Sequence, residues 1–327
     1  MTKIDIYSGF LGAGKTTLIK KMIQEAYVGQ KLVLIENEFG EIGIDGGFLQ
    51  DAGINITEMN SGCICCSLVG DFGKALEKVI AEYAPERIII EPSGVGKLSD
   101  VIGAVEKVTN DDVVLGYTVA VADAGKVKVY MKNFGEFYNN QIETASTIIL
   151  SRTDSIPQAK LDAAVALLRE HNDQATIVVT PWNELTGEQL LEAMGGQASL
   201  AAELAKLEEE HHCGCGHHHD HDEHHCGCGH DHHDHHADEV FTSWGVETTK
   251  KFTVGEIQAA LHCLDMGRYG MVLRAKGIVA CADGGWIHFD YVPEEHNVRM
   301  GAAAVIGKLC VIGSQLAEEE VAKLFGV

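Results

Sequence analysis

Hydrophobic and polar positions alternate in a regular way through the first 180 residues. Short apolar, β-branched runs are separated by stretches with helical periodicity. Strands are predicted at 3–9, 31–37, 54–60, 87–94, 116–123, 147–154 and 176–182, and helices at 16–29, 71–84 and 160–171. Strands that are apolar on both faces are typical of a parallel sheet covered by helices on both sides. The pattern therefore predicts an α/β domain over residues 1–187.

The pattern changes twice after residue 187. Residues 188–210 are rich in Ala, Leu and Glu, which indicates a surface helix, and residues 211–236 are almost entirely His, Cys, Gly and Asp. New strand-like runs follow at 244–253, 271–281, 284–292 and 308–316, with helical patterns at 254–265 and 318–326. We therefore predict a linker with a polar segment over 188–240. A small α+β domain, with one sheet face covered, is predicted over 241–327.

Composition narrows the class of protein. The 327 residues carry a formal charge of −23, which argues against nucleic acid and anionic membranes as partners. The N-terminus shows no basic-then-apolar leader, and no apolar run approaches the roughly 20 residues that span a bilayer. Ten cysteines in such a chain indicate thiols or metal ligands rather than disulfides. We expect a soluble, cytoplasmic protein.

The clearest motif is GFLGAGKT at residues 9–16, which fits G-x-x-x-x-G-K-[ST] between a predicted strand and a predicted helix. Its glycines let backbone N–H groups approach phosphate oxygens. Lys15 would bridge the β- and γ-phosphates, and the Thr16 hydroxyl would bind Mg²⁺. The residues expected to line this triphosphate site are Gly9, Gly12, Ala13, Gly14, Lys15, Thr16 and Thr17.

Two further strand ends carry polar residues that suit the same site. The segment RIIIEPSG contains Glu91, a carboxylate expected on the Mg²⁺ side of the phosphates. Glu91, Lys15 and Thr16 are the residues expected to act in catalysis. The same segment contains Gly94, which would sense the γ-phosphate. The segment SRTD ends another strand with Arg152 and Asp154, a variant of the [NT]-K-x-D guanine-reading motif. The Asp154 carboxylate could accept two hydrogen bonds from guanine, and the stem of Arg152 could cover the base. Taken alone SRTD is also compatible with ordinary strand-end chemistry, but its position favours GTP over ATP.

A cluster of three thiols, Cys63, Cys65 and Cys66, follows the predicted strand at 54–60. It offers a soft site for Zn²⁺ or Co²⁺, and its incomplete ligand shell suits metal transfer. A redox pair at C-x-x-C spacing and buried core cysteines are the alternatives. The upstream stretch IENEFGEIGID carries acidic residues where a switch loop is expected, at Glu36, Glu38, Glu41 and Asp45. These carboxylates could complete the metal shell or respond to Mg²⁺, or they could form a solvated acidic loop.

Residues 211–236 hold thirteen of the seventeen histidines, and the sequence HHCGCGH occurs there twice. Imidazole and thiolate groups bind transition metals, Ni²⁺ included. The ligands expected from the two copies are His211, His212, Cys213, Cys215, His224, His225, Cys226 and Cys228. The alternative is a disordered segment without a metal role. The isolated Cys and His residues after 241 receive no function.

Together these motifs resemble the CobW-like family of metal-handling GTPases, relatives of the nickel chaperones UreG and HypB. The resemblance rests on GFLGAGKTT, IENEFGE, GCICC, EPSG and a His-rich insert, with RAKG and VIGSQLAEEEV in the last domain. It implies a P-loop GTPase fold and slow GTP hydrolysis coupled to the transfer of a metal, often zinc or cobalt. It also implies Glu36, Glu41, Cys65 and Cys66 as metal ligands, with Cys63 close by. The SRTD segment departs from the family's usual TKxD form.

The favoured hypothesis is a GTP-dependent metal chaperone that uses GTP, Mg²⁺ and Zn²⁺ or Co²⁺, with Ni²⁺ possible. It would pass its metal to a client metalloprotein. In this hypothesis the 63–66 cluster is the transfer site, and residues 211–236 are a flexible net of weak sites that feeds it. The alternatives are a metal buffer with a regulatory nucleotide site and a GTPase that assists cobalamin or cobalt-enzyme assembly. A homodimer is left open.

Overall fold

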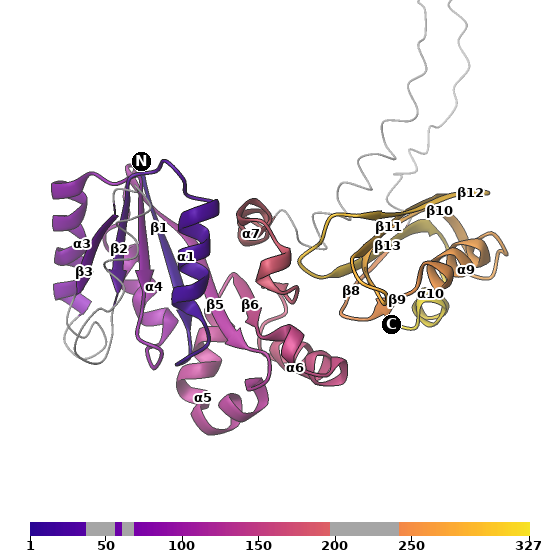
Figure 1. Cartoon of the computed structure of the whole chain (residues 1–327), viewed down its shortest axis with the longest axis horizontal. Helices are drawn as coiled ribbons and strands as arrows, with labels where there is room; N and C mark the ends of the chain where they lie inside the picture. The colour runs from indigo at the N-terminus through magenta and orange to yellow at the C-terminus, as the bar shows by residue number, and fades with distance from the viewer. Residues whose placement is uncertain (37–55, 61–68, 197–241) are drawn as a thin grey trace, which may run out of the picture. The chain divides into compact units, whose positions relative to one another are not determined.

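The computed structural model describes residues 1–36, 56–60, 69–196 and 242–327 (Figure 1). The chain forms two compact units, Met1–Ala198 and Ser199–Val327. Each unit has its own sheet. The predicted boundaries after residues 187 and 240 stay predictions, since the second of them lies outside the described residues.

The first unit is built on a seven-stranded sheet in the order β3-β2-β4-β1-β5-β6-β7. Every neighbouring pair is parallel, and the central strands are buried along most of their length. The parallel sheet predicted from the apolar runs is therefore confirmed. The strands are β1 (Thr2–Gly9), β2 (Leu32–Glu36), β3 (Ile56–Asn60), β4 (Arg87–Glu91), β5 (Val113–Asp123), β6 (Thr147–Ser151) and β7 (Thr176–Val178).

The helices of this unit fall into two groups. They are α1 (Lys15–Glu25), α3 (Val69–Tyr83), α4 (Leu98–Glu106), α5 (Val127–Thr144), α6 (Gln158–His171) and α7 (Gly187–Met194). Helix α1 contacts α7, whereas α3, α4, α5 and α6 contact one another in succession. The connection from β1 to β2, which contains α1, runs in the opposite direction across the sheet from the connections that contain α3, α4, α5 and α6. Because such crossovers are right-handed, the two groups cover opposite faces.

The strand register determines which residues lie side by side at the ends of the strands. Gly9 at the end of β1 pairs with Val121 on β5, and Asp123 on β5 pairs with Ser151 on β6. On the other side of β1, Glu91 at the end of β4 pairs with Glu36 at the end of β2. The carboxyl ends of parallel strands lie at one edge of the sheet, which is where ligands bind in open α/β folds.

The second unit contains the antiparallel order β12-β11-β10-β13-β8, with β9 parallel to β10. The strands are β8 (Thr242–Thr248), β9 (Lys251–Phe252), β10 (Met271–Cys281), β11 (Trp286–Val292), β12 (Glu295–Gly301) and β13 (Gly307–Ser314), and the helices are α9 (Val254–Leu264) and α10 (Glu318–Phe325). Buried Ala275, Val279, Ile287 and Phe289 alternate along β10 and β11 and pack with the helices in one core. The predicted α+β domain with a covered sheet face is confirmed.

Some elements differ from the predictions. Helices α4 and α5 lie between predicted strands, where helical stretches were expected without bounds. Strand β12 was not expected, and the strand predicted over 244–253 is divided into β8 and β9. Helix α5 is hard to recognise because it contains β-branched residues, a glycine and a non-helical break at Phe134. Strand β12 is almost entirely exposed and lacks apolar alternation. Of the helix predicted over 188–210, α7 accounts for the beginning, and the rest lies outside the described residues.

Candidate nucleotide site

The phosphate loop joins β1 to α1 by way of three glycines in conformations that a side chain disfavours. Gly9, Gly12 and Gly14 have φ values of 144°, 68° and 105°. A Cβ on Gly9 would lie 2.3 Å from the Val121 carbonyl oxygen, so only glycine fits there. The loop leads directly into α1, which begins at Lys15. The N–H groups in the first turn of a helix have no partner within the helix and can bind an anion.

The residues predicted to contact the γ-phosphate and Mg²⁺ lie together. Lys15 is buried, and its Nζ donates to the Gly9 carbonyl oxygen at 3.0 Å and lies 4.0 Å from Glu91 Oε1. The Thr16 hydroxyl lies 3.1 Å from each carboxylate oxygen of Glu91. A hydroxyl and a carboxylate that converge in this way offer the hard oxygen ligands that Mg²⁺ prefers.

Gly94 brings the loop after β4 against the phosphate loop. A Cβ on Gly94 would lie 2.7 Å from the backbone nitrogen of Leu11, so the two backbones are in direct contact. The turn is closed by the Gly96 N–H, which donates to the Ser93 carbonyl oxygen at 2.9 Å. Gly94 therefore lies beside the phosphate loop, as a residue that responds to a terminal phosphate must.

At the opposite end of the site, Arg152 is held against the phosphate loop. Its backbone is left-handed, with φ of 56°, and its guanidinium forms an ion pair with buried Asp123 and donates to the Gly12 carbonyl oxygen at 3.0 Å. Asp123 also accepts the Gly125 N–H at 2.9 Å. Asp154 lies two residues further on, in the 3-10 turn Thr153–Ser155, with an exposed carboxylate. The pair predicted to bind the base is therefore adjacent to the phosphate loop.

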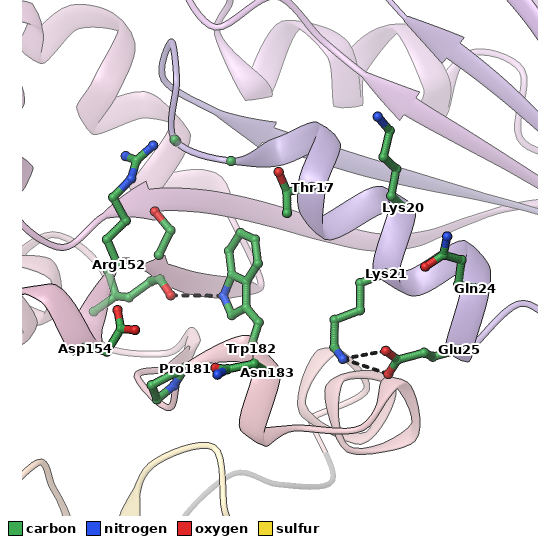
Figure 2. A pocket seen from close by; sticks show the side chains of 14 residues that line it. Thr17, Lys20, Lys21, Gln24, Glu25, Arg152, Asp154, Pro181, Trp182 and Asn183 are labelled. Carbon is green, nitrogen blue, oxygen red and sulfur yellow. Dashed lines mark hydrogen bonds and ion pairs between the residues drawn. The ribbon is translucent and has the colours of Figure 1, made fainter. Parts of the chain in front are cut away.

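A cavity of about 720 Å³ lies at this end of the site, between α1 and the ends of β6 and β7 (Figure 2). In Figure 2, Arg152 and Trp182 lie on the side of the view opposite Lys20, Gln24 and Glu25, with Asp154 and Pro181 beneath them. The volume suits a small-molecule ligand. Its lining is Ala13, Gly14, Thr17, Lys20, Lys21, Gln24, Glu25, Leu150, Ser151, Arg152, Asp154, Pro181, Trp182 and Asn183.

Trp182 is the most conspicuous wall of this cavity. Its indole N–H donates to the Leu150 carbonyl oxygen at 3.0 Å, which fixes the ring and leaves only its apolar surface for a ligand. The ring edge lies 3.0 Å from the place that a Cβ on Gly14 would occupy. A flat aromatic wall beside an anchored guanidinium and a carboxylate is chemistry that suits a planar, hydrogen-bonding base.

Sequence reasoning missed three residues that the structure brings to the site. Asp123 and Trp182 follow buried strands at the same sheet edge as Glu91, so the rule that selected Glu91 could also have found them. Gln141 lies inside α5 and reaches the turn that carries Gly94. No pattern in the sequence points to it.

Most of the predicted metal ligands cannot be placed. Cys63, Cys65, Cys66 and Glu41 lie outside the described residues, as do the eight ligands predicted between 211 and 228. Glu36 is described and pairs in register with Glu91. Within the described ranges, no group of three or more His, Cys, Asp or Glu side chains could hold a metal ion. In that part of the chain, no helix has both the length and the apolar character needed to cross a bilayer.

Two family models cover most of the chain. Residues 3–179 match the CobW/HypB/UreG nucleotide-binding domain, and residues 241–326 match the C-terminal domain of the cobalamin synthesis protein cobW. The first match alone spans more than half of the 327 residues.

Several curated proteins are similar to the chain. It is 31% identical over 246 residues to the zinc chaperone CobW of a Sinorhizobium species, covering 66% of this chain and 69% of that protein. It is 29% identical to the zinc chaperone YeiR of Escherichia coli, covering 47% of each. It is also 27% identical to the zinc-regulated GTPase metalloprotein activator 1 of Schizosaccharomyces pombe, covering 90% of this chain and 76% of that protein. The chain thus spans about half of the length of YeiR and more than two thirds of the length of the other two relatives.

The phosphate loop, the Thr16–Glu91 contact and the cavity beside Asp154 agree with these matches. The chain belongs to the CobW/HypB/UreG family and is a P-loop GTPase by that membership.

Proposed function

We propose that the protein is a GTP-dependent metal chaperone. It binds a transition metal, zinc or cobalt, at Cys63, Cys65 and Cys66 with help from Glu36 and Glu41. It passes the ion to a client metalloprotein in a cycle coupled to GTP hydrolysis. The names of its relatives, zinc chaperones and a GTPase metalloprotein activator, support this function.

The observation that carries the proposal is a row of residues across three neighbouring strands. Asn60 at the end of β3 pairs with Glu36 at the end of β2, and Glu36 pairs with Glu91 at the end of β4. Cys63 follows Asn60 by three residues, so covalent geometry keeps their Cα atoms within about 11 Å of each other. Neighbouring strands are about 4.8 Å apart. The stretch that carries the three thiols therefore leaves the sheet at Asn60, two strands away from Glu91, the carboxylate that contacts Thr16.

This row supplies a route for coupling. Glu91 would respond to the Mg²⁺ that accompanies GTP, and the chain leaves β2 at Glu36 directly into the stretch that carries Glu41. A change in ligands at Glu91 would therefore take place one strand away from Glu36, one of the proposed metal ligands. A cation binding at one site would alter the carboxylates available at the other.

In this proposal the nucleotide is GTP with Mg²⁺. Thr16 and Glu91 contact the metal side of the phosphates, and Lys15 contacts the phosphates themselves. The exposed carboxylate of Asp154 lines a cavity large enough for a nucleoside, where it could accept two hydrogen bonds from the edge of guanine. Adenine offers no such pair of donors, which favours GTP.

Residues 211–236 serve as a net that collects metal for the transfer site. The segment contains thirteen histidines and four cysteines, and it belongs to neither matched domain. Its deletion should lower the total metal bound per chain but leave one tight site and GTP hydrolysis intact. Loss of the tight site on deletion would show that this site lies in residues 211–236 and not at the 63–66 cluster.

The experiment that tests the function is GTP turnover measured with and without Zn²⁺ or Co²⁺. We expect metal to change the turnover rate of the unaltered chain. The double variant Cys65→Ser, Cys66→Ser should lose this response but still bind GTP. Cys263→Ser is the matched control, because this thiol lies in the second unit and should leave the response unchanged. Turnover that ignores metal in every variant would instead favour a metal buffer with a regulatory nucleotide site.

A further inference from the structure

Helix α5 contacts both loops of the nucleotide site. Near its beginning, Tyr130 and Phe134 pack on Phe10 of the phosphate loop, with ring centroids 4.6 Å and 5.0 Å from the Phe10 ring. Near its end, Gln141 reaches the Ser93–Gly96 turn that follows β4. One helix therefore supports the residues on either side of the expected γ-phosphate.

The Gln141 contact is buried and specific. The side chain is 1% exposed, and its Nε2 donates to the carbonyl oxygens of Gly94 at 3.2 Å and Gly96 at 2.8 Å. Two carbonyl acceptors fix which end of the amide faces the turn. Its Oε1 is also buried and has no hydrogen-bond partner among the described residues. The amide therefore makes its contacts through its two donors, both directed at one turn.

Gly94 makes two close contacts. It packs against the backbone of Leu11 in the phosphate loop, where a Cβ would come within 2.7 Å of the Leu11 nitrogen. Its carbonyl oxygen also accepts a hydrogen bond from the Gln141 side chain. Fixing this carbonyl restricts rotation of a glycine that would otherwise sample many backbone conformations. The contact thus sets the direction of the peptide groups that face the phosphate loop.

We propose that Gln141 is a positioning residue for the terminal phosphate. It holds the Ser93–Gly96 turn so that the Gly94 N–H can meet the γ-phosphate of a bound triphosphate. A diphosphate has no group at that position, so Gln141 acts on the affinity for GTP and leaves that for GDP almost unchanged. This inference rests on the proposed nucleotide function but goes beyond it, because it assigns discrimination between nucleotide states to a side chain on α5.

The neighbouring residue supplies a matched control. Asn140 also makes two hydrogen bonds from α5 to the segment after β4, donating to the Ser99 hydroxyl at 3.0 Å and accepting the Ser99 N–H at 3.2 Å. Its contacts are at the start of α4 and not at the Gly94 turn. Asn140→Ala therefore removes a similar amount of bonding between the same elements without releasing Gly94.

The test compares the variants Gln141→Leu and Asn140→Ala in the full chain. Dissociation constants for GDP–Mg²⁺ and for a non-hydrolysable GTP analogue with Mg²⁺ are measured by calorimetry. Because both donors are lost in Gln141→Leu, the dissociation constant of the analogue should rise about tenfold and that of GDP should stay within about twofold. Asn140→Ala should keep the parent ratio of the two constants. An unchanged ratio in Gln141→Leu, or an equal change in both variants, overturns the proposal.

Two further measurements cover loss of folding and failure of the underlying function. If Gln141→Leu does not fold, hydrogen exchange on the unaltered chain decides: the Gly94 amide should be more protected with the analogue than with GDP, and equal protection overturns the proposal. If the unaltered chain binds neither nucleotide, the proposed nucleotide function itself is wrong. Binding of both nucleotides with no effect of Gln141 rejects only the positioning role.

Discussion

The two ends of the nucleotide site differ in how their polar groups are arranged. At the phosphate end, Lys15 bonds to the loop's own Gly9 carbonyl, and Thr16 bonds to Glu91. At the base end, Asp154 is exposed and lines a cavity of about 720 Å³ beside Trp182. At the phosphate end the polar groups thus bond to one another, whereas at the base end an exposed carboxylate faces a cavity.

This difference predicts how binding proceeds. Phosphate and Mg²⁺ must replace hydrogen bonds and ion pairs that the protein already makes, so part of their interaction energy offsets that loss. In the proposed site the base would enter a cavity whose walls are already in place, since Arg152 forms an ion pair with Asp123 and the Trp182 indole donates to the Leu150 carbonyl oxygen. Phosphate contacts should still give the largest mutational effects, because they join charged groups, and base contacts should determine selectivity.

The largest expected effect is at Lys15. Lys15→Ala removes a buried cation that would contact the β- and γ-phosphates, and it should weaken GTP by about 3 kcal/mol, roughly 150-fold. Lys21→Ala is the control, because that lysine lines the base end and forms only a partly exposed ion pair with Glu25. Calorimetry with GTP–Mg²⁺ measures both. Equal, small losses in the two variants would contradict the contrast between the ends.

A smaller and selective effect is expected at Asp154. Asp154→Asn removes an acceptor for guanine and should weaken GTP about tenfold to a hundredfold, with ATP affinity nearly unchanged. Asp173→Asn is a suitable control, since it lies just before the start of β7, away from the carboxyl ends of the strands. Competition binding with GTP and ATP gives the ratio. A native chain that binds ATP as tightly as GTP would show that the guanine assignment is wrong.

The smallest expected change in affinity is at Trp182, where it comes with a spectroscopic signal. Loss of the aromatic wall in Trp182→Leu should weaken GDP by about 1 kcal/mol, roughly fivefold. GDP should also change tryptophan emission in the unaltered chain. That change should persist in Trp244→Phe and Trp286→Phe, whose residues belong to the second unit, and disappear in Trp182→Phe. A signal that depends on Trp286 would place the nucleotide elsewhere.

Sequence patterns predicted the fold where apolar runs and glycine motifs dominate. The buried strands gave the parallel sheet, and GFLGAGKT gave the phosphate loop in its strand–helix context. Glu91, Gly94, Arg152 and Asp154 also lie at the expected sheet edge, because each follows a buried strand in the chain. Their roles in binding and catalysis stay predictions.

Other features depend on contacts that no local pattern contains. Helix α5 is interrupted at Phe134. The contacts of its Gln141 form only when the turn after β4 packs against the helix. Arg152 was expected to cover the base with its stem. The structure adds an ion pair with Asp123, a residue 29 positions earlier in the chain. Such long-range pairs arise from the sheet order, which strand patterns alone do not give.

The central claim is that metal and nucleotide binding are coupled. The most direct measurement is a competition titration of Zn²⁺ or Co²⁺ against a chromophoric chelator, with the chain apo, with GDP–Mg²⁺ and with a non-hydrolysable GTP analogue. The account predicts one tight site whose affinity differs between nucleotide states by about 1–3 kcal/mol, roughly 5- to 150-fold, and falls as pH drops because thiols must ionise. Linkage requires the metal to shift the affinity for the same nucleotide by the same factor. Cys65→Ser with Cys66→Ser should abolish the difference and spare GTP binding. Three equal metal affinities would contradict the account.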